Sequence, residues 1–301
     1  MFKLEGIYPA MLTAFDDEGK VDEMQMRKVV DFQIENGVEG LFPNSSLGEF
    51  IRMSSEEKKK LIKIVFEQAN GRVPVVPGAC AGSADESIAI ANYVEQTGGE
   101  AVVVCPPYYI TMSQAEIIAH YKTIADNINI PLVLYNIPQF TNPIGYEVVK
   151  ELAGHPNVIG MKDSGGNMVD FLNFLDIAKE KNENFSLFTG QGAMVLSALQ
   201  AGGKGSMTGD ANYIPEVVAE LVKSYKEGNL QRALKIQFDI IKLQRVLKQV
   251  PFSIGFKLAM KARGIDMGKP KQPLSSSAQQ QVEKLEPVIK KEVDNILNSI
   301  K

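Results

Sequence analysis

Residues 131–164 read PLVLYNIPQFTNPIGYEVVKELAGHPNVIGMKDS, and this stretch decides the fold. Two short apolar runs, PLVLYNIP from Pro131 and VIGMKDS from Val158, have the composition of buried strands, and an interval long enough for one helix separates them. A strand, a helix and a second strand in this order form a parallel pair joined by a right-handed crossover. The stretch therefore predicts an α/β protein built on a parallel sheet.

The same alternation extends over most of the chain. Eight strand-like runs begin at intervals of 33, 34, 27, 30, 27, 27 and 18 residues. Eight strand–helix units in about 220 residues predict a closed (β/α)8 barrel, or TIM barrel. An open doubly wound sheet is the alternative, but no strand-to-helix turn carries the glycine spacing of a dinucleotide-binding fold. The runs begin at Ile7, Gly40, Pro74, Ala101, Pro131, Val158, Phe185 and Gly203.

After the eighth unit the pattern becomes helical. Residues 215–225, 230–248, 252–263 and 277–300 have helical periodicity with no strand between them, and residues 264–273 form a loop. We divide the chain into a barrel at residues 1–226 and a C-terminal helical segment at residues 227–301. No low-complexity linker separates the two parts, so we expect them to pack as one structural unit.

Composition narrows the possible partners. The 301 residues are 45% hydrophobic and 23% charged with a net charge of -4, and no basic stripe predicts binding to nucleic acid or to an anionic membrane. No stretch approaches the roughly 18 apolar residues of a membrane span, and the first residues lack the apolar core of a signal peptide. We expect a soluble, cytoplasmic protein.

The histidines and cysteines give no indication of a metal site. Cys80 and Cys105 lie in apolar strand-like runs, so they predict neither a disulfide framework nor a thiolate site. His120 and His155 are the only histidines, have no ligand partners in sequence, and are predicted to lie at the surface.

Lys162 is the strongest chemical signal in the chain. A lysine at the carboxyl end of an apolar strand loses water around its ammonium group, which lowers its pKa and makes a nucleophilic amine accessible near pH 7. Such an amine attacks a ketone to form a Schiff base. Alternation places Tyr135 beside it on the neighbouring strand, where a phenol can transfer protons. A lysine that extends to the rim of the barrel is the alternative when this residue is considered alone.

Six motifs together resemble one family. The chain resembles the dihydrodipicolinate synthase and N-acetylneuraminate lyase family of class I aldolases over nearly its whole length. The resemblance implies a barrel with a C-terminal helical segment. The motifs are Pro9-Ala10-x-x-Thr13-x-Phe15, Ser45-Ser46-x-Gly48-Glu49, Pro107-Tyr108-Tyr109, Tyr135-Asn136-Ile137-Pro138, Gly160-x-Lys162 and Thr189-Gly190.

The resemblance implies a catalytic role for four residues. Lys162 matches the lysine that forms an imine with pyruvate or another 2-keto acid, and Tyr135 matches the tyrosine that transfers protons. Ser46 matches a hydroxyl that relays protons between Tyr135 and a second tyrosine, matched by Tyr109, which a neighbouring subunit contributes in relatives. The protein would then be a homo-oligomer, commonly a dimer of dimers, and it would need no cofactor beyond the covalent imine.

The resemblance also implies how the substrate is held. The turn containing Ser45 would bind the pyruvate carboxylate through the backbone amides of Ser46 and Leu47. Gly190 and Met207 match positions that line the pyruvyl pocket.

Two departures from the family pattern bear on the aldehyde partner. Leu47 replaces the second hydroxyl of the Ser-Ser turn, and Phe140 stands where dihydrodipicolinate synthases have an arginine that binds the carboxylate of the aldehyde. A phenyl ring cannot replace a bidentate guanidinium. We therefore expect a lyase acting on a 2-keto-3-deoxy sugar acid such as 2-keto-3-deoxygluconate, with Gln139 and Gln191 donating hydrogen bonds to its hydroxyls.

Two alternatives to this function stay open. The first is 4-hydroxy-tetrahydrodipicolinate synthase, which condenses pyruvate with aspartate semialdehyde. The second is a non-catalytic sensor that binds a keto acid in the barrel.

Overall fold

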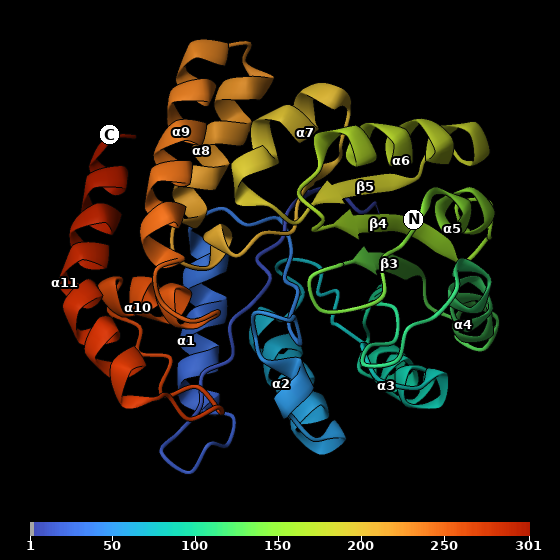
Figure 1. The fold of residues 1–301 in the computed structure, drawn as a ribbon, viewed down its shortest axis with the longest axis horizontal. Helices are drawn as coiled ribbons and strands as arrows, with labels where there is room; N and C mark the ends of the chain where they lie inside the picture. The colour runs from blue at the N-terminus through green and yellow to red at the C-terminus, as the bar shows by residue number, and fades with distance from the viewer. Residues whose placement is uncertain (1–2) are drawn as a thin grey trace.

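A ring of eight parallel strand segments lies at the centre of the computed structural model, which describes residues 3–301 (Figure 1). Six segments form a continuous sheet in the order β1-β6-β5-β4-β3-β2. The other two join through parallel bridges from Ala10 to Phe42, Leu41 to Val75 and Gly78 to Val103, which close the ring. The predicted barrel is confirmed. The strands are β1 (Gly6–Ile7), β2 (Val102–Val104), β3 (Leu132–Asn136), β4 (Val158–Asp163), β5 (Ser186–Thr189) and β6 (Gly205–Ser206).

The second and third runs pair with their neighbours only through isolated bridges. Pro43 and Pro77 lie in these runs, and a proline has no N–H to donate to a ladder. Both runs still provide carbonyls, because Gly78 N–H donates to Pro43 and Val103 N–H donates to Pro77. Proline therefore shortens the regular ladder without opening the barrel.

Alternation along the strands separates two apolar cores. Val102, Val104 and Leu134 point outward and pack against the surrounding helices. Val103, Val133 and Tyr135 belong to the other core, which includes the barrel interior. The register between β3 and β4 pairs Tyr135 with Lys162, so the predicted neighbourhood of phenol and amine is confirmed.

Eight helices follow the strand segments and cover the outside of the barrel (Figure 1). Ser54 and Glu57 form a capping box at the start of α2, and Ser113 and Glu116 form a second one at α4. The helices are α1 (Glu23–Glu35), α2 (Ser55–Ala69), α3 (Ala84–Gln96), α4 (Gln114–Asp126), α5 (Tyr146–Leu152), α6 (Met168–Lys181), α7 (Val195–Ala201) and α8 (Pro215–Lys226). Three 3₁₀ turns, η1 (Phe50–Arg52), η2 (Gly192–Met194) and η3 (Asp210–Asn212), lie between them.

The C-terminal segment consists of α9 (Leu230–Leu247), α10 (Ile254–Ala262) and α11 (Ser276–Asn298), which lie together along one side of the barrel (Figure 1). Helix α10 begins two residues later than the sequence predicts, because Ser253 has a φ of 72° and cannot continue a right-handed helix. Residues 264–273 contain no helix or strand, as predicted. Between residues 3 and 301 no helix has the length and apolar character needed to cross a membrane.

The prediction that both histidines lie at the surface is wrong. His120 is half-buried, and its ring packs edge-on against Tyr121 at 5.7 Å between centroids. The side chain of His155 is only 14% exposed, and its Nε2 lies 3.1 Å from Asp126 Oδ1. These contacts, which sequence spacing alone does not reveal, partly cover both rings.

Candidate active site

A cavity of about 400 Å³ opens at the carboxyl ends of the strands. This volume falls within the range typical of sites for small molecules. Lys162 and Tyr135 come from the barrel, whereas Gln244, Phe252 and Phe256 come from the C-terminal segment. Both parts of the chain therefore build the pocket, although the sequence predicted only barrel residues there.

Lys162 is 2% exposed and lies among aromatic rings. Its Nζ is 4.1 Å from the ring centre of Tyr135 and 4.8 Å from that of Phe42. Within residues 3–301 no carboxylate forms an ion pair with it. Burial lowers the pKa of Lys162 to about 7, because the charged ammonium loses its water without gaining an anion. The neutral amine is therefore accessible near pH 7.

The Tyr135 hydroxyl donates to Ser46 Oγ at 3.4 Å. Burial raises the pKa of Tyr135 well above its ordinary value, so the phenol keeps its proton at neutral pH. The Tyr135–Ser46 contact can pass a proton only if the phenol gives one up as it receives another. The pair is therefore suited to relay protons rather than to store a negative charge.

Hydrogen bonds of the Ser45 hydroxyl fix the turn at residues 45–48. Ser45 is buried and does not line the pocket; its Oγ donates to the Met11 carbonyl at 2.9 Å and accepts from the Gly48 N–H at 3.1 Å. A Cβ at Gly48 would lie 2.6 Å from the Met11 carbonyl oxygen, so this position requires glycine. The hydroxyl of Ser45 stabilises the turn instead of facing the cavity.

Two backbone amides of this turn are available to a ligand. Ser46 and Leu47 line the cavity, and their N–H groups find no acceptor in the part of the chain that the structure describes. Adjacent free N–H groups in a turn form a binding place for an anion. They can hold a small carboxylate even though Leu47 has no hydroxyl.

Gly190 and Met207 lie beside the lysine, as the family pattern implies. A Cβ at Gly190 would overlap the Ser164 hydroxyl and come within 2.8 Å of Lys162 Cε. Met207 is fully buried at the end of the eighth strand segment. The missing side chain at 190 thus gives the lysine room to reach a substrate.

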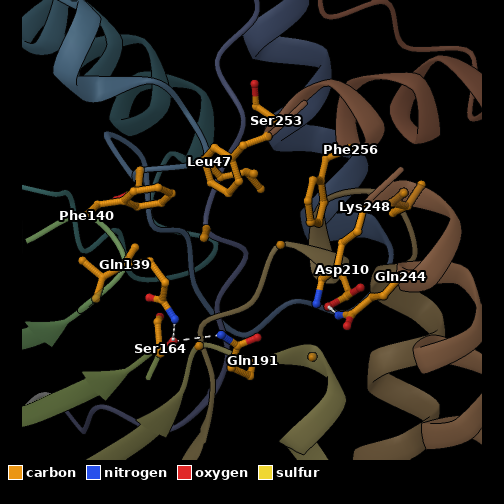
Figure 2. A pocket seen from close by; sticks show the side chains of 18 of the residues that line it. Leu47, Gln139, Phe140, Ser164, Gln191, Asp210, Gln244, Lys248, Ser253 and Phe256 are labelled. Atoms are coloured by element: carbon orange, nitrogen blue, oxygen red, sulfur yellow. Dashed lines mark hydrogen bonds between the residues drawn. The ribbon is translucent and has the colours of Figure 1, made fainter. Parts of the chain in front are cut away.

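Gln139 and Gln191 hold the same carbonyl. Their Nε2 atoms donate to the Ser164 carbonyl at 3.1 and 2.8 Å (Figure 2). Each amide uses one N–H in this contact and keeps its second N–H and its oxygen, so donation by both glutamines to substrate hydroxyls stays a prediction. Phe140 lies near the mouth, with its ring 5.1 Å from that of Phe252.

Tyr109 does not enter the pocket of its own chain. The residue is fully exposed, and its φ of 78° lies in the left-handed region. Its neighbour Tyr108 instead packs against Phe50 at 6.3 Å. The structure thus brings together Lys162, Tyr135, Ser46, Leu47, Gln139, Gly190 and Met207, whereas Ser45 and Tyr109 lie outside the cavity wall.

Several pocket residues were missed by the sequence analysis. Ser164 and Asp210 each follow a strand run closely, so inspecting the end of every run would have found them. Gln244 and Phe256 come from helices of the C-terminal segment, and no sequence signal places those helices over the barrel. Across residues 3–301 no group of three or more His, Cys, Asp or Glu side chains is arranged to hold a metal ion.

Comparison with known proteins agrees with this geometry. A sequence model described as the dihydrodipicolinate synthetase family matches residues 3–292. The chain belongs to this family. Its members are pyruvate-dependent lyases of the class I aldolase type, and the chain is therefore a carbon–carbon lyase that forms a Schiff base.

The similar proteins differ in the aldehyde that their names imply. The 4-hydroxy-tetrahydrodipicolinate synthase of Methanopyrus kandleri is 30% identical over 293 residues, covering 96% of this chain and 97% of that one. The 2-keto 3-deoxygluconate aldolase of Picrophilus torridus is 30% identical with a TM-score of 0.85, covering 90% and 97%. YagE, a family member from E. coli K12 solved with pyruvate, is 27% identical with a TM-score of 0.90, covering 96% and 98%. These relatives belong to one family, and their names refer to different substrates.

Proposed function

We propose that the protein reversibly cleaves a 2-keto-3-deoxy sugar acid, such as 2-keto-3-deoxygluconate, into pyruvate and an aldehyde. The observation that carries this proposal is the buried Lys162 amine beside Tyr135, in a pocket whose mouth has Phe140 and no arginine. The buried amine supplies the chemistry common to the family. The phenyl ring at position 140 gives a carboxylate no charged partner, which favours an aldehyde without one.

The reaction begins with attack of the neutral Lys162 amine on the keto carbon. The carbonyl oxygen takes one proton from the amine and a second from the Tyr135 hydroxyl, which Ser46 and solvent reprotonate, and leaves as water, so that the nitrogen becomes a protonated imine. The free amides of Ser46 and Leu47 would hold the substrate carboxylate during this step. No cofactor enters the proposal, because the imine itself accepts electrons.

Cleavage then breaks the bond between the third and fourth carbons. Tyr135 accepts the proton of the hydroxyl on the fourth carbon as it passes its own proton to Ser46, which releases its hydroxyl proton to solvent. The electron pair of the breaking bond moves to the third carbon and the imine nitrogen, which gives an enamine and releases the aldehyde. Protonation of the third carbon and hydrolysis of the imine release pyruvate and restore the amine.

The competing candidate is 4-hydroxy-tetrahydrodipicolinate synthase, which the name of the M. kandleri relative supports. Its aldehyde, aspartate semialdehyde, carries a carboxylate at the far end. In the pocket of this chain Phe140 offers that carboxylate no hydrogen bond. The sugar acid reaction is therefore the one we propose.

The test follows pyruvate release from 2-keto-3-deoxygluconate with a coupled lactate dehydrogenase assay, with Lys162→Ala as the control. We expect release by the native protein and none by the variant. A native protein that instead consumes aspartate semialdehyde with pyruvate, and leaves the sugar acid intact, would support the synthase. A Lys162→Ala variant that keeps the protein's effect in cells would support the sensor.

We also propose that the protein is a homo-oligomer in which Tyr109 of a neighbouring copy completes the proton relay. The full exposure of Tyr109 supports this proposal. Sedimentation of the native protein and of Tyr109→Phe would test it. A native protein that is active as a monomer would contradict it.

A further inference from the structure

The pocket has a second polar side that the proposed mechanism does not use. Figure 2 shows Asp210, Gln244 and Lys248 grouped on one side of the pocket, with the glutamines at 139 and 191 on the other. Asp210 begins η3 directly after the eighth strand segment, whereas Gln244 and Lys248 lie at the end of α9. This group therefore joins the barrel to the C-terminal segment at the edge of the cavity.

Asp210 is a buried carboxyl with capacity left for a ligand. It is 1% exposed; Oδ1 accepts from the Tyr213 hydroxyl at 2.6 Å and Oδ2 accepts from Gln244 Nε2 at 2.7 Å. A carboxylate has about four acceptor sites, so roughly two remain after these bonds. Burial raises the pKa of Asp210, and the charge of Lys248 acts in the opposite direction. Asp210 lines the cavity, so a ligand bound there lies beside its carboxylate.

Two glycines keep this side of the pocket clear. A Cβ at Gly192 would overlap both Asp210 Oδ2 and Gln244 Nε2, so any side chain there would break their hydrogen bond. A Cβ at Gly209 would lie 2.6 Å from Phe256 Cε1 and 2.9 Å from Leu47 Cδ2. The arrangement of Asp210 and Gln244 thus depends on two further positions in the chain.

We propose that Asp210, Gln244 and Lys248 bind the hydroxyl groups of the aldehyde half of the substrate and select an uncharged, polyhydroxylated aldehyde. This inference rests on the proposed lyase function and names the specificity of the same site.

The distance across the barrel fits this assignment. The segment that precedes Asp210 is two strands away from β4, which carries Lys162, so the two sites are on the order of 10 Å apart. A substrate fixed to the lysine through its second carbon extends its remaining hydroxylated carbons across this gap. Asp210 would accept hydrogen bonds from those hydroxyls.

The charges of the pocket explain the preference for a neutral aldehyde. Apart from Lys162, the charged residues that line it are Asp210 and Lys248. Lys248 is exposed and has no ion-pair or side-chain hydrogen-bond partner among residues 3–301, so its ammonium is free to meet a hydroxyl oxygen. An aldehyde with an anionic group at its far end would meet the negative charge of Asp210 beside the positive charge of Lys248. A hydroxyl group suits this pair of opposite charges, because it can donate a hydrogen bond to Asp210 and accept one from Lys248.

The test compares aldehydes of similar size in the condensation with pyruvate. Glyceraldehyde carries two hydroxyls and propionaldehyde carries none. For Asp210→Asn and Gln244→Met we expect the KM for glyceraldehyde to rise about ten-fold, as for loss of a hydrogen bond to a charged group, with the KM for propionaldehyde unchanged. Lys248→Met should show the same selectivity, and Lys235→Met, on the solvent side of the same helix, should match the native protein.

Four results would overturn the inference. An equal rise in KM for both aldehydes would show that the group only supports the fold, and no change in either would show that it does not contact substrate. A native preference for glyceraldehyde 3-phosphate, lost in Lys248→Met, would show that the site binds an anion. A preference for aspartate semialdehyde, lost in Asp210→Asn, would show that the carboxylate binds an ammonium group.

Borohydride trapping of pyruvate on each variant separates this inference from the proposed function. Variants that trap pyruvate but show the same change in KM for both aldehydes, or no change for either, refute the inference and leave the lyase intact. A native protein that traps no pyruvate refutes both.

Discussion

Lys257→Met should destabilise the protein strongly, although Lys257 lies outside the pocket wall. Its Nζ is 3.2 Å from Glu49 Oε1, and both side chains are buried. Glu49 ends the turn that carries Ser46 and Leu47 and has a φ of 62°. The ion pair therefore connects α10 of the C-terminal segment to the turn that would hold the pyruvate carboxylate.

The size of the stability loss in Lys257→Met depends on the contacts that Glu49 keeps after Lys257 is replaced. Removing one partner of a buried ion pair costs about 3–5 kcal/mol, because the other charge stays buried without compensation. Glu49 Oε2 would still accept from the Lys271 N–H at 3.2 Å and lie 3.6 Å from Arg52 Nη1. We therefore expect the lower end, about 3 kcal/mol, and a fall in Tm on the order of 6 °C.

Lys261→Met is the matched control, since Lys261 is on the same helix. Its Nζ pairs with Glu286 Oε1 at 2.7 Å, with the two side chains 50% and 38% exposed, so its loss should cost less than about 1 kcal/mol. Thermal and urea unfolding of both variants measure the difference. The double variant Glu49→Gln with Lys257→Met should recover part of the loss, because no unpaired charge stays buried. Equal effects of Lys257→Met and Lys261→Met would refute the reasoning.

Three further predictions concern catalysis. Since burial lowers the pKa of Lys162 to about 7, kcat/KM should fall about ten-fold per pH unit below that value and level off above it; a pH profile with no limb near 7 would contradict this. Tyr135→Phe removes the proton relay to Ser46, so kcat should fall about 10²–10⁴-fold while pyruvate still forms a trappable imine. Gly190→Ala places a methyl group against Ser164 and Lys162 Cε, so kcat should fall about 10²-fold with an unchanged circular dichroism spectrum; full activity would show that the lysine can move aside.

The barrel itself could be predicted because its information is local. Each strand run and helix cap lies within a few residues, and the pairing of Tyr135 with Lys162 follows from alternation in two adjacent parallel strands. The short ladders of the second and third runs follow from Pro43 and Pro77, whose effect is also local.

The far side of the pocket could not be predicted in the same way. Gln244 and Phe256 reach the cavity because α9 and α10 pack across the barrel, and helical periodicity does not say where a helix docks. Engagement of the glutamine amides by the Ser164 carbonyl depends equally on three-dimensional contacts. Asp210 is different, because its position after a strand run was visible in the sequence and was not inspected.

The measurement that tests the central claim most directly is the intact mass of the protein after borohydride reduction with pyruvate, followed by peptide mapping. Lys162 is buried beside Tyr135 without an anionic partner among residues 3–301, so the account predicts one reduced pyruvate adduct, located on Lys162 and absent from Lys162→Ala. No adduct on the native protein, or an adduct on another lysine, would contradict the account.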